Sequence, residues 1–146
     1  MNEDDELKWY KACFRIFGDT LQPDAVGRAL GLEPTSSGLK GETLGSSRLK
    51  KPLSSSVWIL QSPLDKRIPL EDHLNWLLDA LEAKRDIVCR ISKQYETDFF
   101  CGFSSENGQG GCTFSAVLLE RLSNLGVPLV LDLYPPGPIT FDPDRN

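Results

Sequence analysis

Apolar and polar residues alternate over residues 8–17, which predicts a strand with one buried face. Its apolar side carries Tyr10, Ala12, Phe14 and Ile16. Its other side is mixed and holds Trp9, Lys11, Cys13, Arg15 and Phe17. Further strands are expected over residues 57–60, 97–103 and 129–134. In the last of these, leucines on one face alternate with Val130, Asp132 and Tyr134 on the other.

Several stretches carry the periodicity and the end signals of helices. Pro23 suits the first position of a short helix that ends at Gly31. A stronger helix begins after Pro69, because leucines recur every three or four residues along one side of it. These leucines are Leu70, Leu74, Leu77, Leu78 and Leu81. Apolar residues spaced four apart then predict a second helix over residues 87–95, after a bend, and a last helix starts at Ser115.

The two halves of the chain show the same order of features. Ala25-Val26 and Ala116-Val117 stand at equivalent positions of two helices, each of which ends in a Leu-Gly pair followed by a proline. Duplicated βαβ units predict a ferredoxin-like α+β fold with a four-stranded, mainly antiparallel sheet and helices on one face. We expect one domain over residues 1–134, with a mobile Ser/Gly-rich loop at 35–56 and a Pro-rich extended tail at 135–146.

Five short motifs follow one another along nearly the whole chain. They are Phe14-Arg15-Ile16-Phe17-Gly18, Leu30-Gly31-Leu32-Glu33-Pro34, Trp58-Ile59-Leu60, Leu70-Glu71-Asp72-His73-Leu74 with Leu77-Leu78, and Leu125-Gly126 through Leu131-Asp132-Leu133-Tyr134. In order and spacing this set resembles the bacterial family called domain of unknown function 4279. The resemblance supports the fold and implies no established activity, ligand or catalytic residue for these positions.

The charge balance narrows the classes of partner. The 146 residues include 16 Lys+Arg and 21 Asp+Glu, which gives a net charge of −5. Because the chain has no long basic run, we expect no nucleic-acid partner. The acidic N-terminus lacks the pattern of a secretory signal, and no segment is long and apolar enough for a membrane span, so a cytoplasmic location without membrane association is expected.

The residues that carry chemistry are few. The four cysteines (Cys13, Cys89, Cys101 and Cys112) are widely spaced, with no Cys-x-x-Cys pair and no neighbouring histidine. We therefore expect reduced thiols, with neither a metal site nor a cofactor.

His73 is the only histidine and lies at the edge of the apolar side of its helix. A structural role, with the ring packed and one nitrogen bonded, is the favoured interpretation, and no catalytic residue is assigned. The alternative is a cleft that His73 shares with the Gly-rich stretch before the last helix, where Gly110, Gly111 and Ser115 could direct N–H groups at an anion. Such a cleft would suit a small-ligand sensor or an enzyme.

The mixed strand faces favour an interaction surface. If helices cover the side that carries Phe14, the opposite side gathers Lys11, Arg15, Asp132, Tyr134 and either Trp58 or Trp9. Trp, Tyr and Arg are the residue types that anchor interfaces. We therefore expect a non-enzymatic binding or interaction module that self-associates through this open sheet face as a homodimer, or that receives a protein partner there. An immunity-type protein that masks a basic partner is a further alternative.

Overall fold

The computed structural model describes residues 8–43, 51–105 and 110–134. The elements follow in the order β1 (Lys8–Gly18), α2 (Pro23–Leu30), β2 (Ser36–Gly38), β3 (Ser56–Gln61), α3 (Leu70–Leu81), a 3₁₀ turn (Glu82–Lys84), α4 (Arg85–Gln94), β4 (Glu96–Ser105), α5 (Ala116–Leu125) and β5 (Leu129–Leu133). The strands and helices expected from periodicity are present, and the 3₁₀ turn is the bend expected between the second and third helices.

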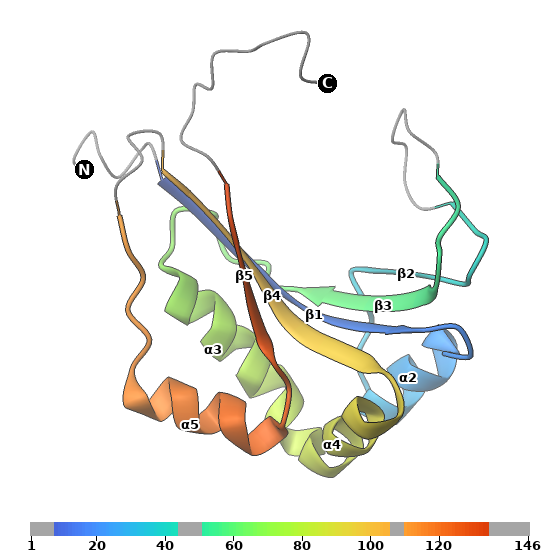
Figure 1. The fold of residues 1–146 in the computed structure, drawn as a ribbon. Helices are drawn as coiled ribbons and strands as arrows, with labels where there is room; N and C mark the ends of the chain where they lie inside the picture. Colours follow the sequence, from blue (N-terminus) through green and yellow to red (C-terminus); the bar gives the residue numbers. More distant parts are fainter. Residues whose placement is uncertain (1–7, 44–50, 106–109, 135–146) are drawn as a thin grey trace, which may run out of the picture.

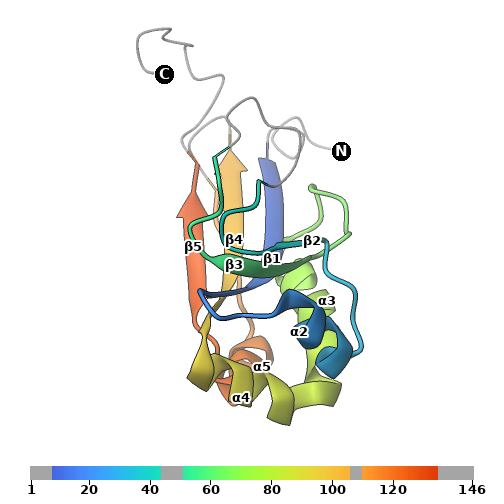
Figure 2. The same cartoon turned by 90° about the vertical axis from the view of Figure 1, so that its right-hand side faces the viewer.

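The strands form one sheet in the order β2-β3-β1-β4-β5. The central strand β1 is antiparallel to β3 and β4, β2 is antiparallel to β3, and β4 and β5 are parallel. The helices lie on one side of this sheet (Figures 1 and 2). The α+β class is therefore confirmed, and no helix of the described residues lies over the other side of the sheet.

The sheet differs from the expected one in its number of strands, which is five. The additional strand, β2, lies in the segment 35–56 that composition assigned to a mobile loop. It lacks large apolar residues and is held by hydrogen bonds to β3, so its sequence gives no periodic signal. The N–H of Thr35 donates to the carbonyl of Ile59 (2.7 Å), and Thr35 Oγ1 accepts from the N–H of Gln61 (2.8 Å). Residues 44–50 of that segment and the expected tail at 135–146 lie outside the described residues.

The two halves also pair their strands differently, so the expected duplication into ferredoxin-like units is not confirmed. In the first half, β1 and β3 flank α2 and are antiparallel neighbours. In the second half, β4 and β5 flank α5 and are parallel neighbours, as a helical crossover allows. The sequence signals of α2 and α5 are therefore similar, although the strands that follow these two helices pair in opposite directions with their neighbours.

The helix ends follow from local residues. The left-handed conformations of Gly31 (φ 67°) and Gly126 (φ 70°) end α2 and α5. Glycine adopts this conformation without the steric cost that a β-carbon brings. Ser115 begins α5, because its Oγ accepts a hydrogen bond from the N–H of Leu118 (3.1 Å).

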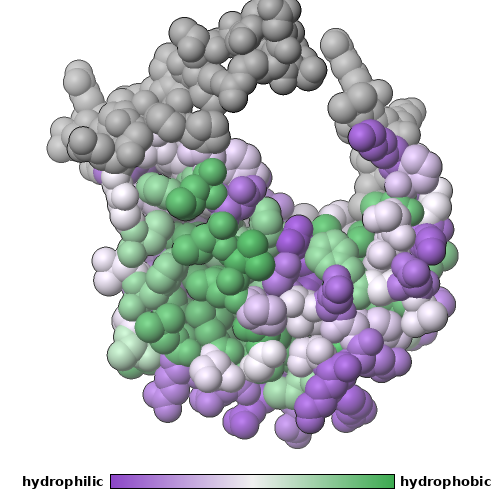
Figure 3. All heavy atoms as spheres, in the orientation of Figure 1, coloured by the Kyte–Doolittle hydropathy of each residue, from purple (hydrophilic) through white to green (hydrophobic). Residues whose placement is uncertain are grey.

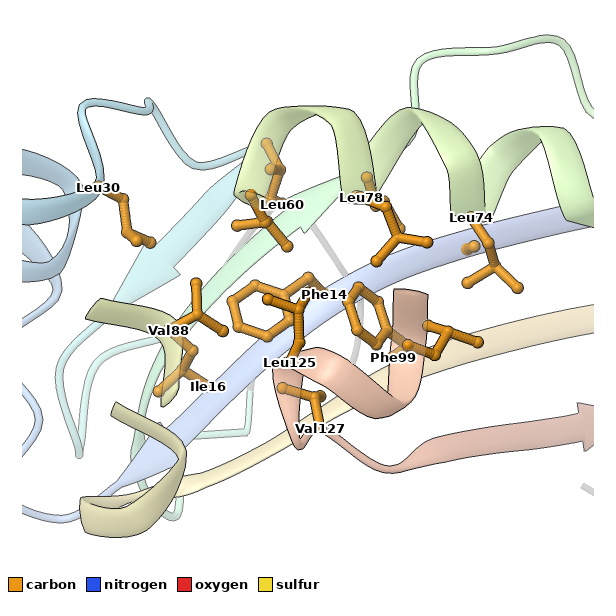
Figure 4. Packing of buried hydrophobic residues seen from close by; sticks show 14 of the residues in the cluster. Phe14, Ile16, Leu30, Leu60, Leu74, Leu78, Val88, Phe99, Leu125 and Val127 are labelled. Carbon is orange, nitrogen blue, oxygen red and sulfur yellow. The ribbon is translucent and has the colours of Figure 1, made fainter. Parts of the chain in front are cut away.

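The core lies between the sheet and the helices (Figure 4). Phe14 on β1 is at its centre, with its ring 5.4 Å from that of Phe99 and 6.2 Å from that of Trp58. The leucines of the expected stripe on α3 all pack into this layer, as does Leu125 of α5. Each such side chain contributes about 1.5–3 kcal/mol by burial, so this layer fixes the position of β1 and β4 and thereby of the opposite sheet face.

Candidate functional site

The sheet face without helices gathers the outward side chains of β1, β4 and β5, and we call it the open face. The strand registers and the alternation along each strand define its members. They are Trp9, Lys11, Cys13, Arg15, Phe17, Asp98, Phe100, Gly102, Val130, Asp132 and Tyr134. Four of the residues expected to form an interaction surface, Lys11, Arg15, Asp132 and Tyr134, are therefore on the same face.

Arg15 is already paired within the chain. It stands opposite Asp98 in the β1–β4 register, and the two form a bidentate ion pair, with Nε to Oδ1 at 2.8 Å and Nη2 to Oδ2 at 2.7 Å. The guanidinium also lies 4.0 Å from the ring centroid of Phe100 and 4.8 Å from that of Phe17. The hydrogen bonds to Asp98 raise the pKa of Arg15, so this partner stabilises its positive charge.

Lys11 lies at the other end of the open face, beside two aromatic rings that contact each other. Its Nζ is 5.4 Å from the ring centroids of both Trp9 and Tyr134, whose rings are 5.0 Å apart. Gly102, opposite Lys11 on β4, leaves room for this arrangement, because a β-carbon there would come within 2.8 Å of Lys11 Cε. Asp132 is paired with Gly102 on the next strand. Lys11 itself forms no ion pair within the described residues.

Cys13 lies between the two cations on β1. Burial raises the pKa of the Cys13 thiol to about 11, and Arg15 only partly offsets this effect. The thiol is therefore protonated at neutral pH and is not an activated nucleophile.

Trp58 is on the opposite side of the sheet from the open face. It is paired with Ile16 in the β1–β3 register, is 0% exposed and contacts Phe14 in the core. The expectation that Trp58 or Trp9 shares the open face is met by Trp9. Residues 57–60 are all apolar, so their pattern could not indicate which side of the strand faces the helices.

His73 is buried near the start of α3, with 1% of its surface exposed. Its Nδ1 is 2.9 Å from Ser62 Oγ, which also accepts from the N–H of Leu64 (3.3 Å). Its Nε2 has no hydrogen-bond partner among the residues that the structure describes. Burial lowers the pKa of His73, and the carbonyls of Ile68 and Asp65, which favour the protonated ring, oppose this only in part. The ring is neutral at pH 7.

A cavity of about 340 Å³ lies beside His73. It follows the edge of β1 where β3 no longer pairs with it, and the loop after β3 closes this edge. The N–H of Ser62 donates to the carbonyl of Ala12 (3.0 Å). The N–H of Tyr10 donates to the carbonyl of Lys66 (2.7 Å). The lining includes Trp9, Tyr10, Lys11, Ser62, Lys66 and His73.

The Gly-rich stretch does not take part in this cavity. Gly110 lies beside Lys8 and Phe103, and neither it nor Gly111 lines the cavity at His73. Ser115 is used to cap α5, and its N–H donates to Glu71 Oε1 (3.2 Å). The structure therefore separates His73 from Gly110, Gly111 and Ser115, which were expected to share one cleft.

A third feature, which the sequence interpretation did not include, is the free edge of the sheet at β5. Within the described residues β5 pairs only with β4. Leu133 is 68% exposed and Leu131 is 49% exposed, although both point to the helix side. Figure 3 shows hydrophobic surface extending over α5 and β5. We call this the edge patch, and its exposed members are Val117, Leu119, Val130, Leu131, Leu133 and Tyr134.

Comparison with known proteins identifies the family of the chain. The family model for a domain of unknown function, DUF4279, matches residues 8–136, which is nearly the whole chain. The chain belongs to this family. No curated protein and no solved structure matches the DUF4279 chain.

The described part of this DUF4279 domain contains no group of three or more His, Cys, Asp or Glu side chains placed to hold a metal ion. None of its described helices is long and apolar enough to cross a membrane. The features that can support a function are thus the open face, the cavity at His73 and the edge patch.

Proposed function

We propose that this DUF4279 domain is a non-enzymatic interaction module that self-associates through the β5 edge of its sheet. The observation that carries the proposal is the edge patch, a strand edge that pairs with no other strand of the described residues and is flanked by exposed apolar side chains. Of the seven large hydrophobic side chains that are exposed in the described residues, six belong to this patch. Contiguous apolar surface beside a free strand edge is characteristic of interfaces.

The open face, where the sequence placed self-association, is a weaker candidate for the contact. Arg15 and Asp98 bind each other, and their neighbours Phe17 and Phe100 cover the guanidinium. A partner that used Arg15 would first have to break this pair. Tyr134 is common to the open face and the edge patch, so it remains an interface residue in the proposal.

A second copy of the chain is the occupant that the strand favours. Two β5 strands can pair antiparallel around a two-fold axis at Leu131, with residues opposite each other on the same face. Leu131 then meets Leu131 of the second copy, and Leu129 meets Leu133. Asp132 stands opposite Val130 of the second copy, which avoids the like-charge pair that an axis at Asp132 would create.

The size of the surface agrees with a modest dimer. Six side chains exposed by a third to two-thirds form an apolar patch on the order of 500 Å², and the surrounding rim extends it toward the roughly 800 Å² per partner of a standard interface. The pairing of the two β5 strands alone would join the sheets of the two copies into one continuous sheet.

Light scattering coupled to size-exclusion chromatography, over about 1 to 100 µM of the full chain, tests the proposal. We expect a dimer for the unmodified chain and a monomer for Leu131→Lys, which places a charge at the two-fold axis. Leu39→Lys is the matched control, because Leu39 is exposed but lies outside the patch. Circular dichroism verifies that each variant folds. A monomer at every concentration, or a Leu131→Lys dimer as strong as the unmodified one, would contradict the proposal.

Cysteine cross-linking tests the register. Opposite residues in an antiparallel pair have Cα atoms about 4.5–5.5 Å apart, within the range that a disulfide spans. Leu131→Cys should therefore form a covalent dimer on mild oxidation, whereas Asp132→Cys should not. The unmodified chain, with its own cysteines, is the control for unrelated cross-links. Cross-linking of Asp132→Cys alone would show that the register is wrong.

A further inference from the structure

We propose that the cavity beside His73 binds a small organic anion, an activity beyond the self-association proposed above. The cavity volume of about 340 Å³ is in the range of small-molecule sites, which are roughly 300–1,000 Å³. The cavity is bounded by β1, α3 and the loop after β3, and the β5 edge does not line it. Its occupation can therefore be tested whether or not the chain self-associates.

Two cations without an acidic partner in the described residues give the cavity its charge preference. Lys11 and Lys66 both line it, and neither forms an ion pair within the described residues. The carboxylates that act on His73 are those of Asp72 and Asp65, and Asp65 is engaged by Arg67 (3.3 Å). In a chain with a net charge of −5, a concave surface with two ammonium groups that no carboxylate neutralises attracts anions locally.

A hydrogen bond to Ser62 fixes the ring of His73 in the wall of the cavity. Ser62 Oγ accepts from the N–H of Leu64, so its own proton can donate to Nδ1 of His73. This arrangement places the ring proton on Nε2, the nitrogen that has no partner in the described residues. The carbonyls of Ile68 and Asp65 also act on this buried ring, so His73 contributes a wall of fixed position, and Lys11 and Lys66 supply the charge of the cavity.

Aromatic walls define the rest of the ligand. Trp9 and Tyr10 line the cavity from opposite faces of β1. The ring of Trp9 also contacts Lys11 and Tyr134, and these contacts hold it in place as a wall. A flat apolar body that carries one carboxylate fits this combination of rings and cations better than a bare inorganic ion does.

Titration of the full chain with sodium benzoate, followed by ¹H–¹⁵N NMR, tests the inference. We expect a saturable shift of the Trp9 indole N–H signal, which reaches half its final value at about 1 mM benzoate or less. The buried Trp58 indole, on the other side of the sheet, is the internal reference. Benzamide, which has the same ring without the charge, and acetate, which has the charge without the ring, should each bind at least about tenfold more weakly.

Two variants distinguish a site from general attraction to a charged surface. Lys66→Met should weaken benzoate binding about tenfold, because it removes one cation from the lining. Lys93→Met removes an equal charge from exposed α4 and should leave binding unchanged. Equal affinity for benzamide and benzoate, an unaltered Lys66→Met titration, or no saturable shift up to about 10 mM would each overturn the inference.

Discussion

Breaking the ion pair of Arg15 and Asp98 should lower the free energy of unfolding by about 2 kcal/mol. Substitution of either residue should remove the same interaction. The two side chains are 24% and 16% exposed and make two short hydrogen bonds. An exposed pair is worth about 0–1 kcal/mol, whereas a hydrogen bond to a charged group is worth about 1.5–3 kcal/mol when water is excluded. The partial burial of this pair therefore predicts a coupling energy of about 1.5–2 kcal/mol.

A double-mutant cycle measures this coupling. Urea titrations of the unmodified chain, Arg15→Met, Asp98→Ala and the double variant give the four unfolding free energies. In thermal melts, a loss of 2 kcal/mol should appear as a fall in Tm of roughly 4–10 °C for a chain of this size. Because the pair is partly buried, 0.5 M salt should reduce the coupling only in part, by about half or less.

The exposed pair of Lys40 and Asp19 is the matched control, since its side chains are 56% and 62% exposed. The same cycle there should give a coupling too small to measure. A coupling below about 0.5 kcal/mol for Arg15 and Asp98 would refute the reasoning. It would show that both charges are solvated and free for a partner, and the open face would again be a candidate for self-association.

Three further predictions concern residues elsewhere in the fold. The unfolding free energy should fall as the pH is lowered through about 6.5, because burial lowers the pKa of His73 and protonation therefore favours the unfolded chain. Since His73 is the only histidine, His73→Gln should remove this dependence on pH. Urea titrations at about pH 7.5 and 5.5 measure it, and an equal change in unfolding free energy between these pH values for both proteins would contradict the assignment. Leu78→Ala should cost about 2–5 kcal/mol in a urea titration, because Leu78 is fully buried, and a loss below 1 kcal/mol would place it outside the core. Ser115→Ala should cost about 1 kcal/mol through the lost helix cap, whereas Ser115→Thr should retain most of it, and equal melts of the two variants would contradict the capping role.

The elements that could be predicted from the sequence are those whose signals are local. The alternation around Phe14 defines β1 and its buried side, because a half-buried strand requires period two. Gly31 and Gly126 mark helix ends, because each position requires a left-handed conformation. These features depend on neighbours in sequence, so a single chain is sufficient to find them.

The features that were missed depend on pairing between distant segments. Trp58 lies in an all-apolar run, and only its register opposite Ile16 decides that it faces the core. Asp98 is the partner that fixes Arg15, but the two are 83 residues apart and no spacing rule links them. The alternation within 97–103 does place Asp98 on the mixed face, and this was the one available signal for the ion pair.

The two edges of the same sheet differ in how they are protected, and this difference supports the contact proposed at β5. Natural sheets protect their edges with very short strands or with charged side chains along the edge. At one edge, β2 is three residues long and contains only serine and glycine, so it offers little surface for another strand. At the other edge, β5 presents Leu131 and Leu133, and its one charge, Asp132, points to the open face. Among the described residues one edge is therefore protected and the other is not, which is expected if the β5 edge is covered by a second copy. Leu131→Lys would give β5 the same kind of protection, so its effect on self-association tests the difference between the two edges directly.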